Sequence, residues 1–112
     1  MRVAINRSFI ATTMTALLVS PGFAQDMSRA EKRGEGLLSR HCAMCHAIGR
    51  NGSSPHPVAP PFRTLSQRYP IDALQESLGE GLSSGHPEMP EFVFPSHDVE
   101  AIILYLQSIQ QP

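Results

Sequence analysis

The sequence predicts an all-α domain of about three helices joined by long loops. Three segments repeat apolar residues at helical spacing, and we find no pair of alternating strands and no internal repeat. The chain has 112 residues, enough for one domain, and its ten prolines and eight glycines gather between residues 49 and 95. This distribution indicates a loop-rich middle between more regular ends.

The first predicted helix opens at Ser28, where Ser28 and Glu31 match a capping box. Apolar and small residues then fall at spacings of three and four up to His41. Gly34 lies on that face, although a glycine inside a helix costs about 1 kcal/mol relative to alanine. Either a neighbouring segment comes very close at Gly34, or the helix end is frayed.

Two further helices are predicted downstream. Residues 70–78 can start with Pro70 in the first helical position and end at Gly79 or Gly81. Pro95 and Ser96 provide a stop and a cap for the last helix, which carries the clearest apolar stripe. The stripe consists of Val99, Ile102, Ile103, Leu106 and Ile109.

Residues 1–24 have the order of a secretory signal peptide. Arg2 and Arg7 precede an apolar stretch of about 13 residues, and Gly22-Phe23-Ala24 offers a small-residue cleavage site. The stretch is shorter than the roughly 20 residues of a membrane-spanning helix, although an uncleaved anchor is the competing interpretation. We therefore expect a signal peptide at 1–24, a mature domain at 25–112, and a periplasmic protein without a membrane anchor.

Charge excludes one class of function. The formal net charge of the whole chain is -1, and removal of Arg2 and Arg7 leaves seven basic against ten acidic residues. Proteins that bind nucleic acid through its phosphates need a strong basic excess. We therefore expect no nucleic-acid partner.

The segment Cys42-Ala43-Met44-Cys45-His46 carries the chemistry. The pattern C-x-x-C-H is the attachment signature of haem c. On a helical turn the two cysteines point to one side, where their sulfurs can add to the two vinyl groups of a haem. His46, next in the chain, is then placed to ligate the iron. The motif predicts one covalently bound haem.

Three other uses of two cysteines are weighed against haem. A structural zinc site needs four ligands, and the chain has no second cysteine pair. A thioredoxin-like redox pair belongs at a strand-helix junction, which this sequence lacks. A local disulfide in an exported protein is the third alternative.

From about Ser28 to Gln110 the chain resembles a monohaem class I cytochrome c. The resemblance implies the small cytochrome c fold, with helices and long loops wrapped around one covalent haem. It implies that the last helix crosses the first, with Tyr105 against Gly34, although Leu38 stands where the family often has an aromatic residue. It also implies that the Pro60 carbonyl accepts a hydrogen bond from His46, although prolines that merely stiffen the loop are the alternative.

The resemblance extends to the sixth iron ligand. Met89-Pro90-Glu91-Phe92 resembles the M-P-x-F stretch that supplies the distal methionine in this family. The alternatives are a methionine that fills the core and ligation by His86, three residues away. Four side chains are candidates for contact with the haem propionates, and the sequence does not choose among Arg50, Arg63, Arg68 and Tyr69.

A haem ligated by histidine and methionine has no open position, so the resemblance implies a single-electron carrier and not an enzyme, with no catalytic residues. We expect a monomer that exchanges electrons with redox proteins, a donor dehydrogenase or an acceptor oxidase, in a respiratory or dehydrogenase-linked chain. Two alternatives stay open. One is a haem c subunit of an oxidoreductase complex, and the other is a gas-binding haem protein with an open iron site.

Overall fold

The computed structural model describes residues 21–82 and 87–112, and in this part of the chain all regular structure is helical. Helix α1 spans Pro21–His41, α2 spans Leu74–Glu80 and α3 spans Ser96–Ile109. Two short 3-10 helices, η1 (Phe62–Gln67) and η2 (Ile71–Ala73), lie between α1 and α2. The prediction of an all-α domain with long loops is confirmed.

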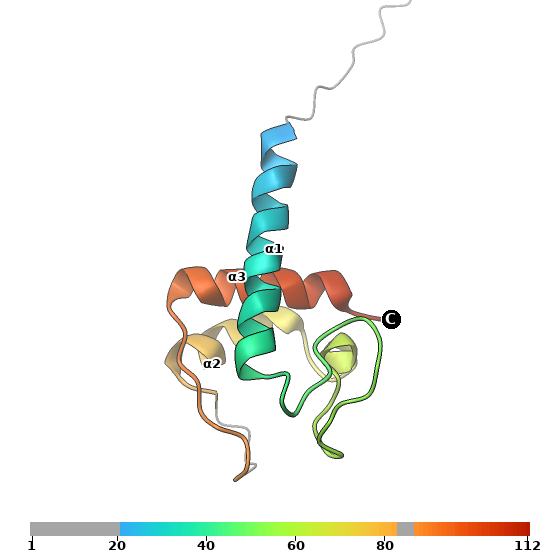
Figure 1. Cartoon of the computed structure of the whole chain (residues 1–112). Coiled ribbons are helices and arrows are strands. Elements are labelled where there is room, and N and C mark those ends of the chain that lie inside the picture. Colours follow the sequence, from blue (N-terminus) through green and yellow to red (C-terminus); the bar gives the residue numbers. More distant parts are fainter. Residues whose placement is uncertain (1–20, 83–86) are drawn as a thin grey trace, which may run out of the picture.

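Helix α1 crosses α3 at Gly34, and Figure 1 shows the two helix axes nearly perpendicular in this view. Gly34 is buried, and a Cβ added there would overlap the Ala101 carbonyl oxygen and lie 2.9 Å from the Tyr105 Cβ. Only a residue without a side chain lets the two backbones approach this closely. The predicted crossing is confirmed, and the frayed-end interpretation of Gly34 is wrong.

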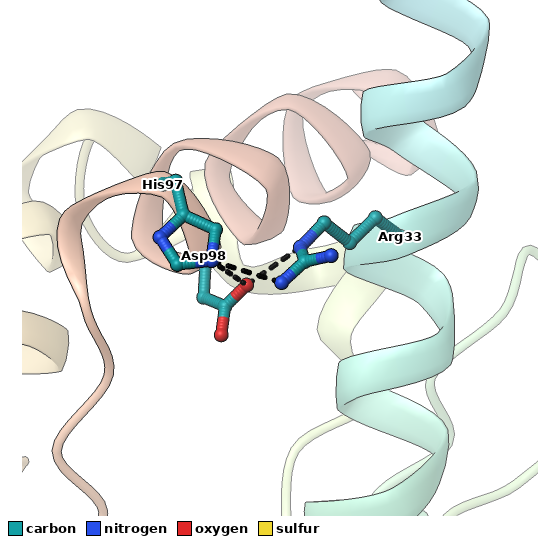
Figure 2. A network of polar contacts seen from close by, with 3 residues as sticks. All are labelled: Arg33, His97 and Asp98. Atoms are coloured by element: carbon teal, nitrogen blue, oxygen red, sulfur yellow. Dashed lines mark hydrogen bonds and ion pairs between the residues drawn. The ribbon is translucent and has the colours of Figure 1, made fainter.

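A polar cluster joins the same two helices at the start of α3. Arg33 donates from Nε to Asp98 Oδ1 over 2.6 Å, and its Nη2 lies 2.9 Å from His97 Nε2 (Figure 2). A guanidinium only donates, so the His97 Nε2 must accept this bond. Asp98, buried in the first turn of α3, also lies near the positive end of the helix dipole.

Helix α3 lies at the centre of the core. The whole predicted stripe is buried, and Ile102 and Ile109 are 0% and 2% exposed. The cluster also includes residues from the other helices, among them Leu38 of α1, Phe62 and Leu65 of η1, Ile71 of η2 and Leu78 of α2. Leu38 is 2% exposed, so the aliphatic side chain fills the position where an aromatic one was expected.

The start of α1 differs from the prediction. The helix begins at Pro21, seven residues before Ser28, so Ser28 and Glu31 lie inside it and form no capping box. Residues 21–24 of the expected signal peptide are helical, and the rest of that segment lies outside the described residues. Among the helices described, none has the length and hydropathy needed to cross a bilayer.

The other helix starts also differ in detail. Pro70 precedes the helical residues in extended geometry, and Ile71 is the first helical residue. Pro95 is the cap residue of α3, and no side chain makes a capping hydrogen bond there. Helix α2 ends at Glu80 and is capped by Gly81, whose φ of 125° suits a glycine. The helix η1 was missed because six residues in 3-10 geometry show too few periods to reveal a pattern.

Candidate haem-attachment site

The C-x-x-C-H motif forms a turn directly after α1. The amide of Cys42 donates to the Leu38 carbonyl over 2.8 Å, and the amide of His46 donates to the Cys42 carbonyl over 2.9 Å. These bonds continue the helical geometry for one more turn. The α1–α3 crossing thereby fixes where the motif lies, because Cys42 directly follows the rigid helix that carries Gly34.

The two cysteines form no disulfide with each other, and both are half-buried. Burial, followed by the neighbouring Cys45, raises the pKa of Cys42 to about 11. A thioredoxin-like pair instead has a lowered pKa that favours the thiolate. The environment of Cys42 therefore favours a neutral sulfur among apolar neighbours, which fits a thioether bond to a porphyrin.

The orientation of His46 is set by its hydrogen bond to Pro60. Its Nδ1 lies 2.8 Å from the Pro60 carbonyl oxygen, and its ring lies 4.5 Å from the Phe62 ring between centroids. A carbonyl only accepts, so Nδ1 carries the hydrogen. In the neutral ring, Nε2 then keeps a lone pair, which is the state that a metal ligand requires.

The loop between the motif and η1 is tied back to the motif. The His56 amide donates to the Cys45 carbonyl over 3.1 Å, and the Phe62 amide donates to the Ala47 carbonyl over 2.9 Å. The Ser54 hydroxyl accepts a bond from the Ala47 amide over 3.0 Å. Pro60 is therefore held opposite His46 by bonds on both sides of the loop.

Met89 lies in the distal segment, which we define as residues 87–95. Figure 1 shows residues 47–61 on one side of the C-terminal end of α1 and the distal segment on the other. Met89 is half-buried between the exposed residues Pro87, Glu88, Pro90 and Glu91. His86, the rival ligand, lies outside the described residues.

One side-chain contact joins the two sides. The His56 Nε2 lies 2.8 Å from the Oε2 of Glu88, and Glu88 directly precedes Met89 in the chain. This contact was not predicted from the sequence, because 32 residues separate the partners and neither belongs to a periodic pattern. His41 also contacts other side chains, since its ring lies edge-on to Phe92 and to Phe94, 5.5 Å from each between centroids.

Two observations fit a haem at this site. Cys42 of the motif packs against the edge of the core, and the other half-buried apolar side chains at that edge are Ile48, Leu74 and Phe92. In addition, the Arg63 Nη1 is the one buried side-chain nitrogen or oxygen in the described part of the chain that has no hydrogen-bond partner. A buried guanidinium nitrogen needs an acceptor, and a haem propionate is an acceptor of the right charge.

The comparison with family models decides the class. Residues 29–106 match the model described as cytochrome c oxidase, cbb3-type, subunit III. The chain belongs to this cytochrome c family. Neither the search of curated proteins nor the search of solved structures found a match.

Family membership and fold together define the molecule. It is a monohaem c-type cytochrome with a small all-α fold, its cofactor is covalently bound haem c with iron, and electron transfer is its activity. The zinc alternative finds no donor set, because no group of three His, Cys, Asp or Glu side chains could hold a metal among the residues described. A thioredoxin-like site needs a strand-helix junction, and the described residues of the cytochrome contain no strand.

Proposed function

We propose that this cytochrome carries single electrons on a haem attached through Cys42 and Cys45, with His46 and Met89 as the axial ligands. The bond from His46 Nδ1 to the Pro60 carbonyl is the observation that carries the proposal. It holds the ring in one tautomer and directs Nε2 away from the loop. Such a second bond makes the imidazole a stronger ligand and fixes its orientation.

Met89 supports the distal half of the proposal by its position. The distal segment that contains it lies across the C-terminal end of α1 from residues 47–61 (Figure 1), and prolines at 87 and 90 restrict the backbone around Met89. A thioether is a weak ligand, so a segment of restricted freedom retains it better than a flexible one. Methionine and histidine together fill both axial positions of the iron and raise its reduction potential above that of a bis-histidine haem.

The remaining contacts support binding of the rest of the cofactor. The half-buried side chains Ile48, Leu74 and Phe92 can cover the porphyrin, and Arg63 can bind a propionate. The Arg63 side chain then neutralises charge that would otherwise favour ferric iron. Of the four propionate candidates from the sequence, the unpartnered Nη1 favours Arg63.

We further propose export to the periplasm with cleavage after Ala24. The charged, apolar and small-residue order of residues 1–24 supports it. Cleavage there removes the first four residues of α1 and leaves Gly34 and the crossing intact. The intact mass of the exported protein tests the proposal, because a mass that includes Met1 to Ala24 would indicate an anchor.

The attachment is tested by mass spectrometry of the denatured protein. The proposal predicts one haem retained under denaturing conditions, with Cys42→Ser and Cys45→Ser each removing one thioether and the double variant losing all covalent haem. Met44→Ser, an exposed substitution between the two cysteines, is the control and should retain the haem. Covalent haem in the double cysteine variant would contradict the assignment.

The family match favours a second candidate. Because the matching model is named for a subunit of an oxidase, this cytochrome domain can also serve as the haem c subunit of an oxidoreductase complex. Purification from membranes and from the soluble fraction at low ionic strength separates the two cases. A carrier is recovered alone, whereas a subunit is recovered with its complex.

A further inference from the structure

A shallow groove lies between α2 and the start of α3. Gly79 of α2 and Phe94 and Val99 beside it supply apolar surface. Val93 also lines the groove and is 64% exposed, a large fraction for a branched aliphatic side chain outside a core. Exposed apolar side chains scattered singly are ordinary, but one that lines a groove with other apolar groups is typical of a contact surface.

Carboxylates flank this apolar surface. Glu76 of α2 and Glu100 of α3 both line the groove and are exposed, and neither pairs with a basic side chain in the part of the chain described. Two neighbouring acidic residues are paired, since Asp98 of α3 binds Arg33 and Glu88 of the distal segment contacts His56. The groove therefore presents two free negative charges beside an apolar surface.

The charge of the chain is divided between two consecutive stretches. Residues 36–69 contain four arginines and no Asp or Glu, whereas residues 70–112 contain seven Asp and Glu and no Lys or Arg. The groove belongs wholly to the acidic stretch. A field of one sign over a surface attracts partners of the opposite sign and speeds their association.

The groove is also close to the attachment motif. Phe94 lines it, and the Phe94 ring lies 5.5 Å from the His41 ring between centroids. His41 is the last residue of α1 and directly precedes Cys42. A protein bound in the groove is thus linked to the attachment cysteine through two packed rings, a short route for an electron.

We infer that this groove docks a protein partner through a basic segment in which lysines or arginines flank an aliphatic side chain. The aliphatic group packs on Val93 and Phe94, and the basic groups pair with Glu76 and Glu100. Charge complementarity selects a basic partner. A second copy of this chain also offers positive charge, through the arginines of residues 36–69. The test must therefore distinguish binding of a separate basic partner from self-association.

Short peptides test the groove on the haem-loaded protein. The probes are acetylated, amidated pentapeptides Lys-Lys-Leu-Lys-Lys, Lys-Lys-Ser-Lys-Lys and Glu-Glu-Leu-Glu-Glu, followed by amide chemical shifts at low ionic strength. The leucine peptide should shift Gln75, Gly79 and Val99, and its affinity should fall at least about threefold at 0.15 M salt, where screening is strong. The serine peptide should bind more weakly, and the acidic peptide should not bind.

Variants assign the contacts. Glu76→Gln combined with Glu100→Gln should weaken the leucine peptide about three- to tenfold, as expected for two exposed ion pairs. Val93→Ser should remove the preference for leucine over serine. Glu35→Gln, an exposed carboxylate on α1 outside the groove, is the control and should leave the affinity unchanged.

Several results would overturn the inference. Shifts confined to residues 36–69, equal binding of the acidic peptide, or an equal loss in Glu35→Gln would each show that the groove is not the site. Shifts of the groove amides that depend on protein concentration without peptide would show that a second copy occupies it. These readouts do not depend on which residue is the distal ligand. The docking inference can therefore hold even if the assignment of Met89 as the ligand fails.

Discussion

The α1–α3 crossing and the distal segment position the same cofactor site by different means. At the crossing, two helices meet with no room for a Cβ at Gly34, and side chains such as Ile102 and Leu106 are almost completely buried. The distal segment has exposed residues on both sides of Met89, and the contacts that hold it are few. They include the bond from the Phe94 amide to the Leu78 carbonyl and the His56–Glu88 pair.

The difference indicates where each half of the site gets its stability. The motif turn inherits its position from buried packing, which is stiff and intolerant of added volume. In the proposed ligation, Met89 would be held by two neighbouring prolines, by the surface contact of Glu88 with His56 and by its own bond to the iron. Substitutions at the crossing should therefore change folding stability, whereas substitutions in the distal segment should change ligation with little effect on the fold.

Among the substitutions that test this difference, removal of both cysteines should have the largest effect on stability. Cys42→Ala with Cys45→Ala should abolish covalent haem and most of the cooperative unfolding, because a domain of this size buries too little apolar surface by itself. Circular dichroism during heating measures the cooperativity of unfolding. A sharp thermal transition without haem would mean that the crossing alone holds the fold.

Met89→Ala should open the distal side while the fold stays intact. The reduced variant should bind carbon monoxide rapidly and should lose the near-infrared methionine-to-iron band of the oxidised state. Met44→Ala is the matched control, since Met44 is 88% exposed and should change neither signal. Met89→His should keep six ligands and lower the reduction potential, because imidazole favours ferric iron. Unchanged spectra in Met89→Ala would transfer the role to His86.

Gly34→Ala tests the crossing with a single methyl group. The added Cβ overlaps backbone at Ala101, which cannot move aside as a side chain can, so we expect a loss of about 2–3 kcal/mol in the free energy of unfolding. Gly36→Ala is the control on the same helix. Its Cβ meets only the end of Arg40, at 3.5 Å, and the change should stabilise the helix by up to about 1 kcal/mol. Equal effects of the two substitutions would contradict the crossing.

Tyr105→Phe removes the hydroxyl that donates to the Ile48 carbonyl over 3.1 Å. The expected loss is about 1 kcal/mol at neutral pH. Burial, followed by Glu35, raises the pKa of Tyr105, so the folded state favours the protonated phenol. The stability it contributes is complete below the ordinary tyrosine pKa near 10 and is lost as the pH rises through the raised value. Denaturant titrations at pH 8 and pH 11 should show the difference between the two proteins shrinking.

Glu88→Ala should have the smallest effect. Glu88 has a side chain that is 79% exposed, and an exposed pair contributes about 0.5 kcal/mol. We expect a slight fall in stability and a modest rise in the rate of carbon monoxide binding, because the distal segment opens more often. Glu80→Ala, an exposed glutamate that forms no ion pair in the described structure, is the control. A loss above about 2 kcal/mol would show a tighter distal segment than described.

The same contrast separates what sequence reasoning predicted from what it missed. Local periodicity predicted the apolar stripe from Val99 to Ile109. The crossing itself was predicted from the family resemblance, which matched Gly34 and Tyr105 to the contact between the first and last helices. The His56–Glu88 and Arg33–Asp98 pairs join residues 32 and 65 positions apart, with no periodic signal at either end. Arg63 was one of four candidates until its burial without a partner distinguished it.

The α1 helix illustrates a different miss. Ser28 and Glu31 have the residue types of a capping box, yet the helix continues back to Pro21. The pattern shows that these residues could cap a helix, but it does not prevent the preceding residues from being helical. The Pro60 carbonyl, in contrast, lies where the family resemblance placed it relative to His46, 2.8 Å from Nδ1. Its role beside bound haem remains part of the proposal.

The central claim is an iron with both axial positions filled, and a carbon monoxide titration of the unmodified reduced protein tests it most directly. With His46 and Met89 bound, the absorption spectrum of the reduced haem should change slowly or not at all on addition of carbon monoxide. Rapid and stoichiometric binding would contradict the account and identify a gas-binding haem protein instead.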